Sequence, residues 1–204
     1  MLSLACFIPT ACKKFVEVAP PKNQLVSESV FTTDQTATAA IIGLYSKMMT
    51  DFSGFAFANG GITTYTGLSG DEFINYSNSP DQTQFYENSL QPTNTNLPLL
   101  WGNAFNYIYT CNAMIEGLNN ASSLSPTVKN QLTGEAYFLR AFNYFYLTNL
   151  FGELPLVTGT SYQVNQSIAK SNRSLVYHQI ISDLQIAIPL LSTDYSFSGG
   201  ERIR

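Results

Sequence analysis

Few side chains in this sequence have the types and spacing that catalysis requires. His178 is the only histidine, so a Ser-His-Asp or Cys-His mechanism would depend on one residue in an amphipathic helical stretch. Asp71 and Glu72 are the only adjacent carboxylates in a long polar segment, whereas glycosidases place two carboxylates across the bond that they cleave. We therefore expect no catalytic residue, no cofactor and no enzymatic activity.

The three cysteines, Cys6, Cys12 and Cys111, are spaced for neither a metal site nor a disulfide framework. Cys111 lies in an apolar helical stretch, where a small buried hydrophobe is the usual role of a cysteine. Cys12 follows the short apolar run 1–11, which ends in a small residue and is interpreted as the remnant of a bacterial lipoprotein signal. We expect Cys12 to be lipidated. The alternative is an unprocessed apolar N-terminus, since no basic residue precedes Cys12.

Charge is sparse and unevenly distributed along the chain. Charged residues make up 12% of the 204 residues and the net charge is −4, which argues against a nucleic-acid partner. No Lys or Arg occurs between Lys47 and Lys129, although this interval is rich in aromatic residues. A segment with many rings and amides but no cations favours neutral ligands over anionic ones. The alternative is that most of these rings fill the core.

Within this interval, Asp71, Tyr76 and Asn78 are our candidate ligand-binding residues. The carboxylate and amide can hydrogen-bond to the hydroxyls of a saccharide, and the tyrosine ring can pack against its C–H face. The alternative is that Asp71 and Asn78 only stabilise turns, as such residues commonly do in loops.

Four stretches have the apolar periodicity and end signals of helices. The first begins near Thr32, where Gln35 completes the spacing of a capping box. The others are expected at about 98–120, 126–151 and 174–191, with Ser125-Pro126 starting the third and Gly152 ending it. Gly, Pro, Ser, Thr and Asn interrupt residues 51–96, which we expect to be a long irregular segment with short strands near 62–65.

These elements predict an all-α fold of antiparallel helix pairs that resembles tetratricopeptide repeats. Residues 12–31, with Pro20-Pro21, are expected to be an extended tether, and residues 32–204 a helical domain. No capping element follows the last helix, so the repeat stack is expected to be incomplete at its C-terminal end. Trp101 is expected in the core. Glu135 and Arg140 are expected to serve as local helix charges or to join adjacent helices, rather than to bind a ligand.

Several segments together resemble the SusD/RagB family of Bacteroidetes lipoproteins. They are the Cys12 tether, the 30–45 helix, the Trp101 helix, the stretch 134–157 that contains Ala136-Tyr137-Phe138-Leu139-Arg140-Ala141, and the last helix with Asp183-Leu184. The resemblance implies a surface-facing lipoprotein anchored in the outer membrane. It also implies an oligosaccharide or other nutrient as ligand, a SusC-like TonB-dependent transporter as partner, and part of the ligand surface between the first helix and the Trp101 helix. The alternative is a helical-repeat scaffold that binds a protein and no small ligand.

Overall fold

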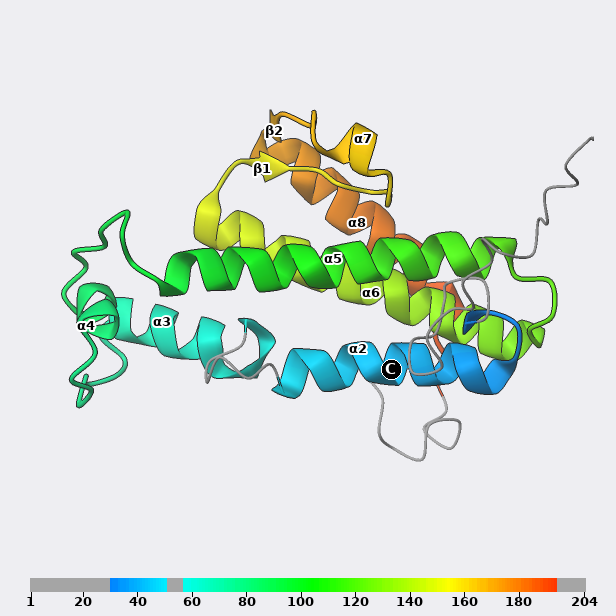
Figure 1. Cartoon of the computed structure of the whole chain (residues 1–204), viewed down its shortest axis with the longest axis horizontal. Coiled ribbons are helices and arrows are strands. Elements are labelled where there is room, and N and C mark those ends of the chain that lie inside the picture. Colours follow the sequence, from blue (N-terminus) through cyan, green and yellow to red (C-terminus); the bar gives the residue numbers. More distant parts are fainter. Residues whose placement is uncertain (1–29, 51–56, 194–204) are drawn as a thin grey trace, which may run out of the picture.

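The computed structural model describes residues 30–50 and 57–193. The predicted signal remnant, Cys12 and the tether up to residue 29 lie outside the described residues. Helices dominate, and the predicted all-α fold is confirmed (Figure 1). The helical elements are α2 (Asp34–Thr50), η2 (Phe57–Gly61), α3 (Ile62–Ser69), α4 (Pro80–Tyr86), α5 (Asn96–Asn120), α6 (Pro126–Phe151), α7 (Tyr162–Asn165) and α8 (Arg173–Leu190). Two short strands, β1 (Leu154–Pro155) and β2 (Lys170–Ser171), pair antiparallel between α6 and α8.

The long helices α5 and α6 run antiparallel, and α8 packs on α6 (Figure 1). Helix α2 contacts both α5 and α6 and covers another side of the pair. The core lies between these four helices because each contributes a buried apolar stripe at helical spacing. Its fully or nearly fully buried members include Ile41 and Leu44 of α2, Ile108 and Leu118 of α5, Leu132 and Leu139 of α6, and Val176 and Ile180 of α8.

The predicted helix ends are largely confirmed by the caps. The Ser125 hydroxyl accepts a hydrogen bond from the Val128 N–H at 3.4 Å, and Pro126 opens α6. Gly152, with a φ of +81°, follows the last residue of α6. In α2 the observed cap is Thr33, whose Oγ1 accepts from the Thr36 N–H at 3.2 Å, one residue after the predicted position.

The prediction of an irregular segment at 51–96 is wrong for about half of its described part, and the strands expected near 62–65 are replaced by a helix. Residues 57–69 form η2 and α3, and residues 80–86 form α4. Tyr65 and Leu68, one helical turn apart on α3, are both buried, and the Tyr65 ring stacks on Phe85 of α4 at 4.5 Å between centroids. Tertiary packing therefore stabilises α3, whose glycine, serine and threonines are weak helix formers, together with the short helix α4.

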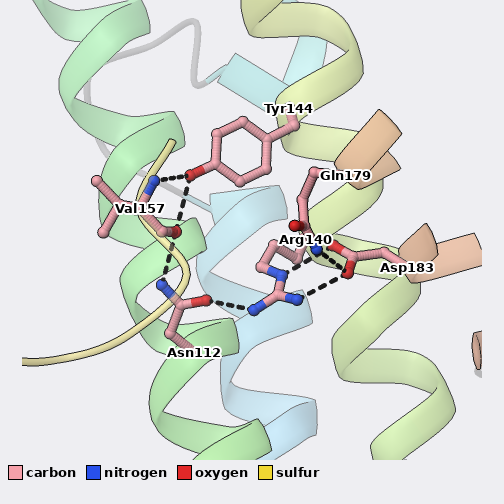
Figure 2. Close-up of polar contacts among 6 residues, drawn as sticks. All are labelled: Asn112, Arg140, Tyr144, Val157, Gln179 and Asp183. Atoms are coloured by element: carbon pink, nitrogen blue, oxygen red, sulfur yellow. Dashed lines mark hydrogen bonds and ion pairs between the residues drawn. The ribbon is translucent and has the colours of Figure 1, made fainter. Parts of the chain in front are cut away.

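A buried polar network connects the helices (Figure 2). Arg140 of α6 donates two hydrogen bonds to Asp183 of α8, from Nε to Oδ2 at 2.8 Å and from Nη2 to Oδ1 at 2.7 Å. A third bond runs from its Nη1 to Oδ1 of Asn112 on α5 at 2.8 Å. Gln179 also donates to Asp183 Oδ1 at 2.7 Å. Burial lowers the pKa of Arg140, but the hydrogen bonds and charge of Asp183 outweigh it and raise the pKa, so the guanidinium stays charged.

The same network holds the segment that follows α6. The Asn112 side-chain amide donates to the Val157 carbonyl at 3.0 Å. The Tyr144 hydroxyl donates to that carbonyl at 2.8 Å and accepts from the Val157 N–H at 2.7 Å. Of the two structural roles expected for Arg140, the structure shows that it joins helices, with partners on α5 and α8. Its partner Asn112 in turn holds the connecting segment.

Candidate functional site

The loop between α3 and α4, residues 70–79, carries the three predicted ligand residues. Its first half is fixed on the end of α3. The backbone N–H groups of Glu72 and Phe73 both donate to the Gly67 carbonyl, at 3.0 and 3.1 Å. Asp71 has a φ of +59°, the left-handed conformation that turns the chain back over the helix.

The Phe73 ring rests directly on Gly67. A Cβ atom at Gly67 would lie 2.5 Å from the Phe73 ring carbon Cε2, so only glycine lets the ring approach the helix this closely. The ring remains 42% exposed on its other side. The loop is therefore held by packing as well as by backbone hydrogen bonds.

The second half of the loop is held by α4. Asn75 donates from Nδ2 to the Thr83 hydroxyl at 3.1 Å and accepts from the Ser77 N–H at 3.0 Å. The Ser77 hydroxyl in turn accepts from the Ser79 N–H at 3.1 Å, just before Pro80 opens α4. These bonds support Tyr76, whose side chain is 87% exposed. An aromatic ring on a fixed loop loses little conformational freedom when a ligand packs on it.

A hollow of about 500 Å³ lies between the loop, α3 and α4. It is lined by Thr64, Leu68, Glu72, Phe73, Ile74, Asn75, Tyr76, Ser77 and Gln82. We call these residues the α3–α4 groove. They combine two aromatic rings and two aliphatic side chains with a carboxylate, two amides and two hydroxyls. Exposed rings beside fixed hydrogen-bonding groups suit a ligand with both C–H faces and hydroxyls.

The three predicted ligand residues do not share this hollow equally. Tyr76 lines it, whereas Asp71 and Asn78 are exposed neighbours that are not among its lining residues. The structure adds Glu72, Asn75 and Gln82 as polar groups that sequence reasoning did not select. In sequence Glu72 stands out only as half of a carboxylate pair with Asp71, and no pattern indicates that Gln82 would face the loop.

Two further hollows lie elsewhere. One of about 350 Å³ is mostly apolar and lies between α3, α4 and the facing ends of α5 and α6, beside the Tyr65–Phe85 stack. The other, of about 500 Å³, lies at the C-terminal half of α5. There Glu116 accepts hydrogen bonds from the Thr160 N–H at 2.9 Å and hydroxyl at 2.6 Å. Its carboxylate thus fixes the segment before α7.

The residues capable of catalysis remain apart. His178 is exposed on α8, as predicted for a solvated helix face. Cys111 is fully buried, and burial raises the pKa of its thiol to about 12, so it is protonated and unreactive at neutral pH. Within residues 30–50 and 57–193, no group of His, Cys, Asp and Glu could hold a metal ion.

The sequence matches a known family over most of its length. Residues 14–198 match the SusD-like family model described as "Starch-binding associating with outer membrane". The chain belongs to the SusD-like family. Among curated relatives, SusD-like protein P38 of Formosa agariphila is 25% identical over 97% of this chain and 38% of its own length. SusD-like protein P2 of the same organism is 29% identical over 82% of this chain and 33% of its own length.

Solved structures show the same SusD-like fold. A SusD-like carbohydrate binding protein from Bacteroides fragilis has a TM-score of 0.68 at 21% identity, covering 87% of this chain and 35% of that one. A laminarin binding SusD-like protein has a TM-score of 0.67 at 23% identity, covering 83% and 37%. The chain thus spans about a third of the length of the relatives that it matches. No helix in the described part of this SusD-like chain combines the length and hydropathy that crossing a bilayer needs.

Proposed function

We propose that this SusD-like chain takes part in capturing oligosaccharides at the outer-membrane surface, for delivery to a SusC-like TonB-dependent transporter. One observation carries the proposal: Tyr76 stands 87% exposed above a hollow that also contains amide, hydroxyl and carboxylate groups. An exposed aromatic ring has no packing role, yet the loop that presents it is fixed by hydrogen bonds to both α3 and α4. The family description and the carbohydrate-binding relative support the same ligand class.

Binding would use two kinds of contact in the α3–α4 groove. The C–H face of a sugar ring packs against Tyr76, with Phe73 and Ile74 as further apolar surface. The sugar hydroxyls bond to Glu72, Gln82 and the neighbouring Asp71 and Asn78. Each neutral hydrogen bond contributes about 0.5–1.5 kcal/mol net, so several are needed together with the stacked ring.

The scaffold alternative rests on a different surface. Helix α8 exposes Leu175, Ile181 and Ile188, the last 72% exposed, and Ile181 and Ile188 lie on the same side of the helix. Exposed apolar side chains that gather on one side of a helix are suited to contact with another polypeptide. This surface fits a protein partner or a further helix of a longer chain, and it does not compete with the groove for a sugar.

Glycan titration of the purified protein tests the proposal. The probes are laminarin and dextran, with heat of binding as the readout. Tyr76→Ala should abolish measurable binding while the melting temperature stays within about 1 °C, because the removed ring supports no packing. Tyr162→Ala is the matched control, since this α7 tyrosine is 77% exposed and lies outside the groove. Equal glycan binding by both variants would contradict the Tyr76 site. Failure of the wild type to bind either glycan, together with capture of a protein partner that substitutions on α8 abolish, would favour the scaffold.

A further inference from the structure

The α3–α4 groove lies in a part of the molecule that carries carboxylates and no cations. Since no Lys or Arg occurs between Lys47 and Lys129, none lies on α3, α4, α5 or the loops that join them. Arg140 is buried and committed to Asp183. In Figure 1, α3 and α4 form one end of the molecule, away from the start of α6 that carries Lys129. An anion bound in the groove would therefore meet no counter-charge on the surrounding elements.

Glu72 places a negative charge in the groove itself. Its side chain is exposed and lines the hollow, and its backbone N–H is fixed to the Gly67 carbonyl at 3.0 Å. Among the described residues, no side chain donates a hydrogen bond to its carboxylate, which leaves both oxygens available to a ligand. Asp81 differs, because it accepts hydrogen bonds from the Thr95 N–H, at 3.2 Å, and the Thr95 hydroxyl. The Asp81 carboxylate is thus engaged in tying α4 to the start of α5.

We infer that the groove selects neutral oligosaccharides and rejects acidic ones, with Glu72 as the residue that sets this selection. The inference rests on the proposed glycan-binding function of the same groove. A sugar hydroxyl can donate a charge-assisted hydrogen bond to Glu72, which is stronger than a bond between neutral groups. A uronate or sulfate instead adds a further negative charge beside the carboxylates of Glu72 and Asp71. Like charges 4 Å apart in water repel by ~1 kcal/mol, which is about a fivefold loss of affinity.

Polymers that carry either a charged or a neutral substituent of similar size distinguish the effect of ligand charge on affinity from the effect of ligand shape. Laminarin and dextran are each compared with a carboxymethylated form and with a hydroxyethylated form of equal substitution, which adds bulk without charge. At low salt, the carboxymethylated polymer should bind about fivefold more weakly than the hydroxyethylated one. The difference should shrink as salt is raised to 0.5 M, because screening removes repulsion between exposed charges.

Two variants assign the effect to a residue. Glu72→Gln keeps the shape and a hydrogen-bond acceptor, and it should bring the low-salt difference to about twofold or less. Glu153→Gln removes one exposed carboxylate outside the groove and should leave the difference at about fivefold. Equal affinities for the two derivatives, or a difference that Glu72→Gln leaves intact, overturn the inference while leaving glycan binding in place. Failure of the unmodified and neutral polymers to bind overturns the proposed function and the inference with it.

Discussion

Arg140 and Asp183 form a bidentate ion pair, with N–O distances of 2.7 and 2.8 Å, in the contact between α6 and α8. Both side chains are at least 95% buried, and the third nitrogen of the guanidinium bonds to Asn112 on α5. Three helices therefore converge on one cation. The pair compensates its own desolvation only while every hydrogen bond is made, so the geometry fixes the register of the helices as well as their contact.

Removing one partner should therefore be severe. Asp183→Asn keeps the volume but leaves the Arg140 charge uncompensated, and we expect a loss of about 3–5 kcal/mol in the free energy of unfolding. The measurement is chemical denaturation followed by circular dichroism. Glu153→Gln is the control, since it removes an exposed carboxylate and should change stability by less than about 0.5 kcal/mol. A loss below about 1 kcal/mol in Asp183→Asn would contradict the structural role of the pair.

Gly67 offers a separate test of the loop. In Gly67→Ala the new methyl group would collide with the Phe73 ring at 2.5 Å, so the ring and the 70–79 loop must move. We expect a loss of about 1–3 kcal/mol together with weaker glycan binding. Gly43→Ala in α2 is the matched control because nothing lies within 4 Å of the added Cβ. That substitution should leave binding unchanged and stabilise the protein by about 0.5–1 kcal/mol.

Local sequence patterns predict the long helices of this chain but not the short helices α3 and α4. The long helices were predictable because apolar periodicity and end signals agree in them: Ser125-Pro126 opens α6 and Gly152 ends it. Helices α3 and α4 were missed because α3 contains several weak helix formers and α4 is short. They form because Tyr65 and Phe85 stack across two segments that are 20 positions apart in sequence, a contact that no short window contains.

The ligand site remains a prediction, and the sequence selected only some of the residues that line the hollow. The absence of cations and the exposed polar loop pointed to residues 62–96, and Tyr76 does line a hollow there. Gln82 lines the hollow because α4 packs beside the loop, and the hydrogen bond between Asn75 and Thr83 helps to hold the two together. The partners of Arg140 were hidden for the same reason, since Asn112 and Asp183 are 28 and 43 positions away from it.

Cys111 should be inert toward thiol reagents in the folded protein. Burial raises its pKa to about 12, while an unfolded cysteine titrates near 8.5. At pH 8, a disulfide reagent should therefore modify it only after denaturant is added. Between about pH 9 and 12 the unfolded chain loses the thiol proton while the native state retains it, so this residue makes stability fall as pH rises. A Cys111→Ala variant should lose that part of the alkaline slope. Fast labelling of Cys111 in the native protein, measured in a Cys6→Ala/Cys12→Ala background, would contradict the assignment.

Cys12 remains predicted as the lipidation site. In cells that process lipoproteins, the full-length protein should partition with the membrane fraction, and Cys12→Ala should release it into the soluble fraction. Metabolic labelling with a fatty-acid analogue provides the direct measurement. Cys6→Ala is the control, because the predicted processing removes that residue together with the signal. Unchanged fractionation of Cys12→Ala would count against the anchor.

Trp101 packs against the core as expected, but its side chain is only partly buried and lies at the edge of the core. Its indole lies 4.8 Å from the Phe105 ring and 5.2 Å, edge to face, from the Phe151 ring, between ring centroids. It therefore joins the start of α5 to the end of α6. Complete burial of a tryptophan would make its truncation cost about 3–5 kcal/mol, and the partial burial lowers our expectation to about 1–3 kcal/mol.

The same substitution separates packing from ligand contact, because Trp101 is not among the residues that line the α3–α4 groove. Trp101→Ala should lower the melting temperature by several degrees and leave laminarin affinity within about twofold at a temperature where the variant is folded. Trp101→Phe should recover part of the stability, since a smaller ring still contacts Phe105. A variant with an unchanged melting temperature and no binding would make Trp101 a sugar platform, and the ligand surface would then extend from the loop onto the start of α5.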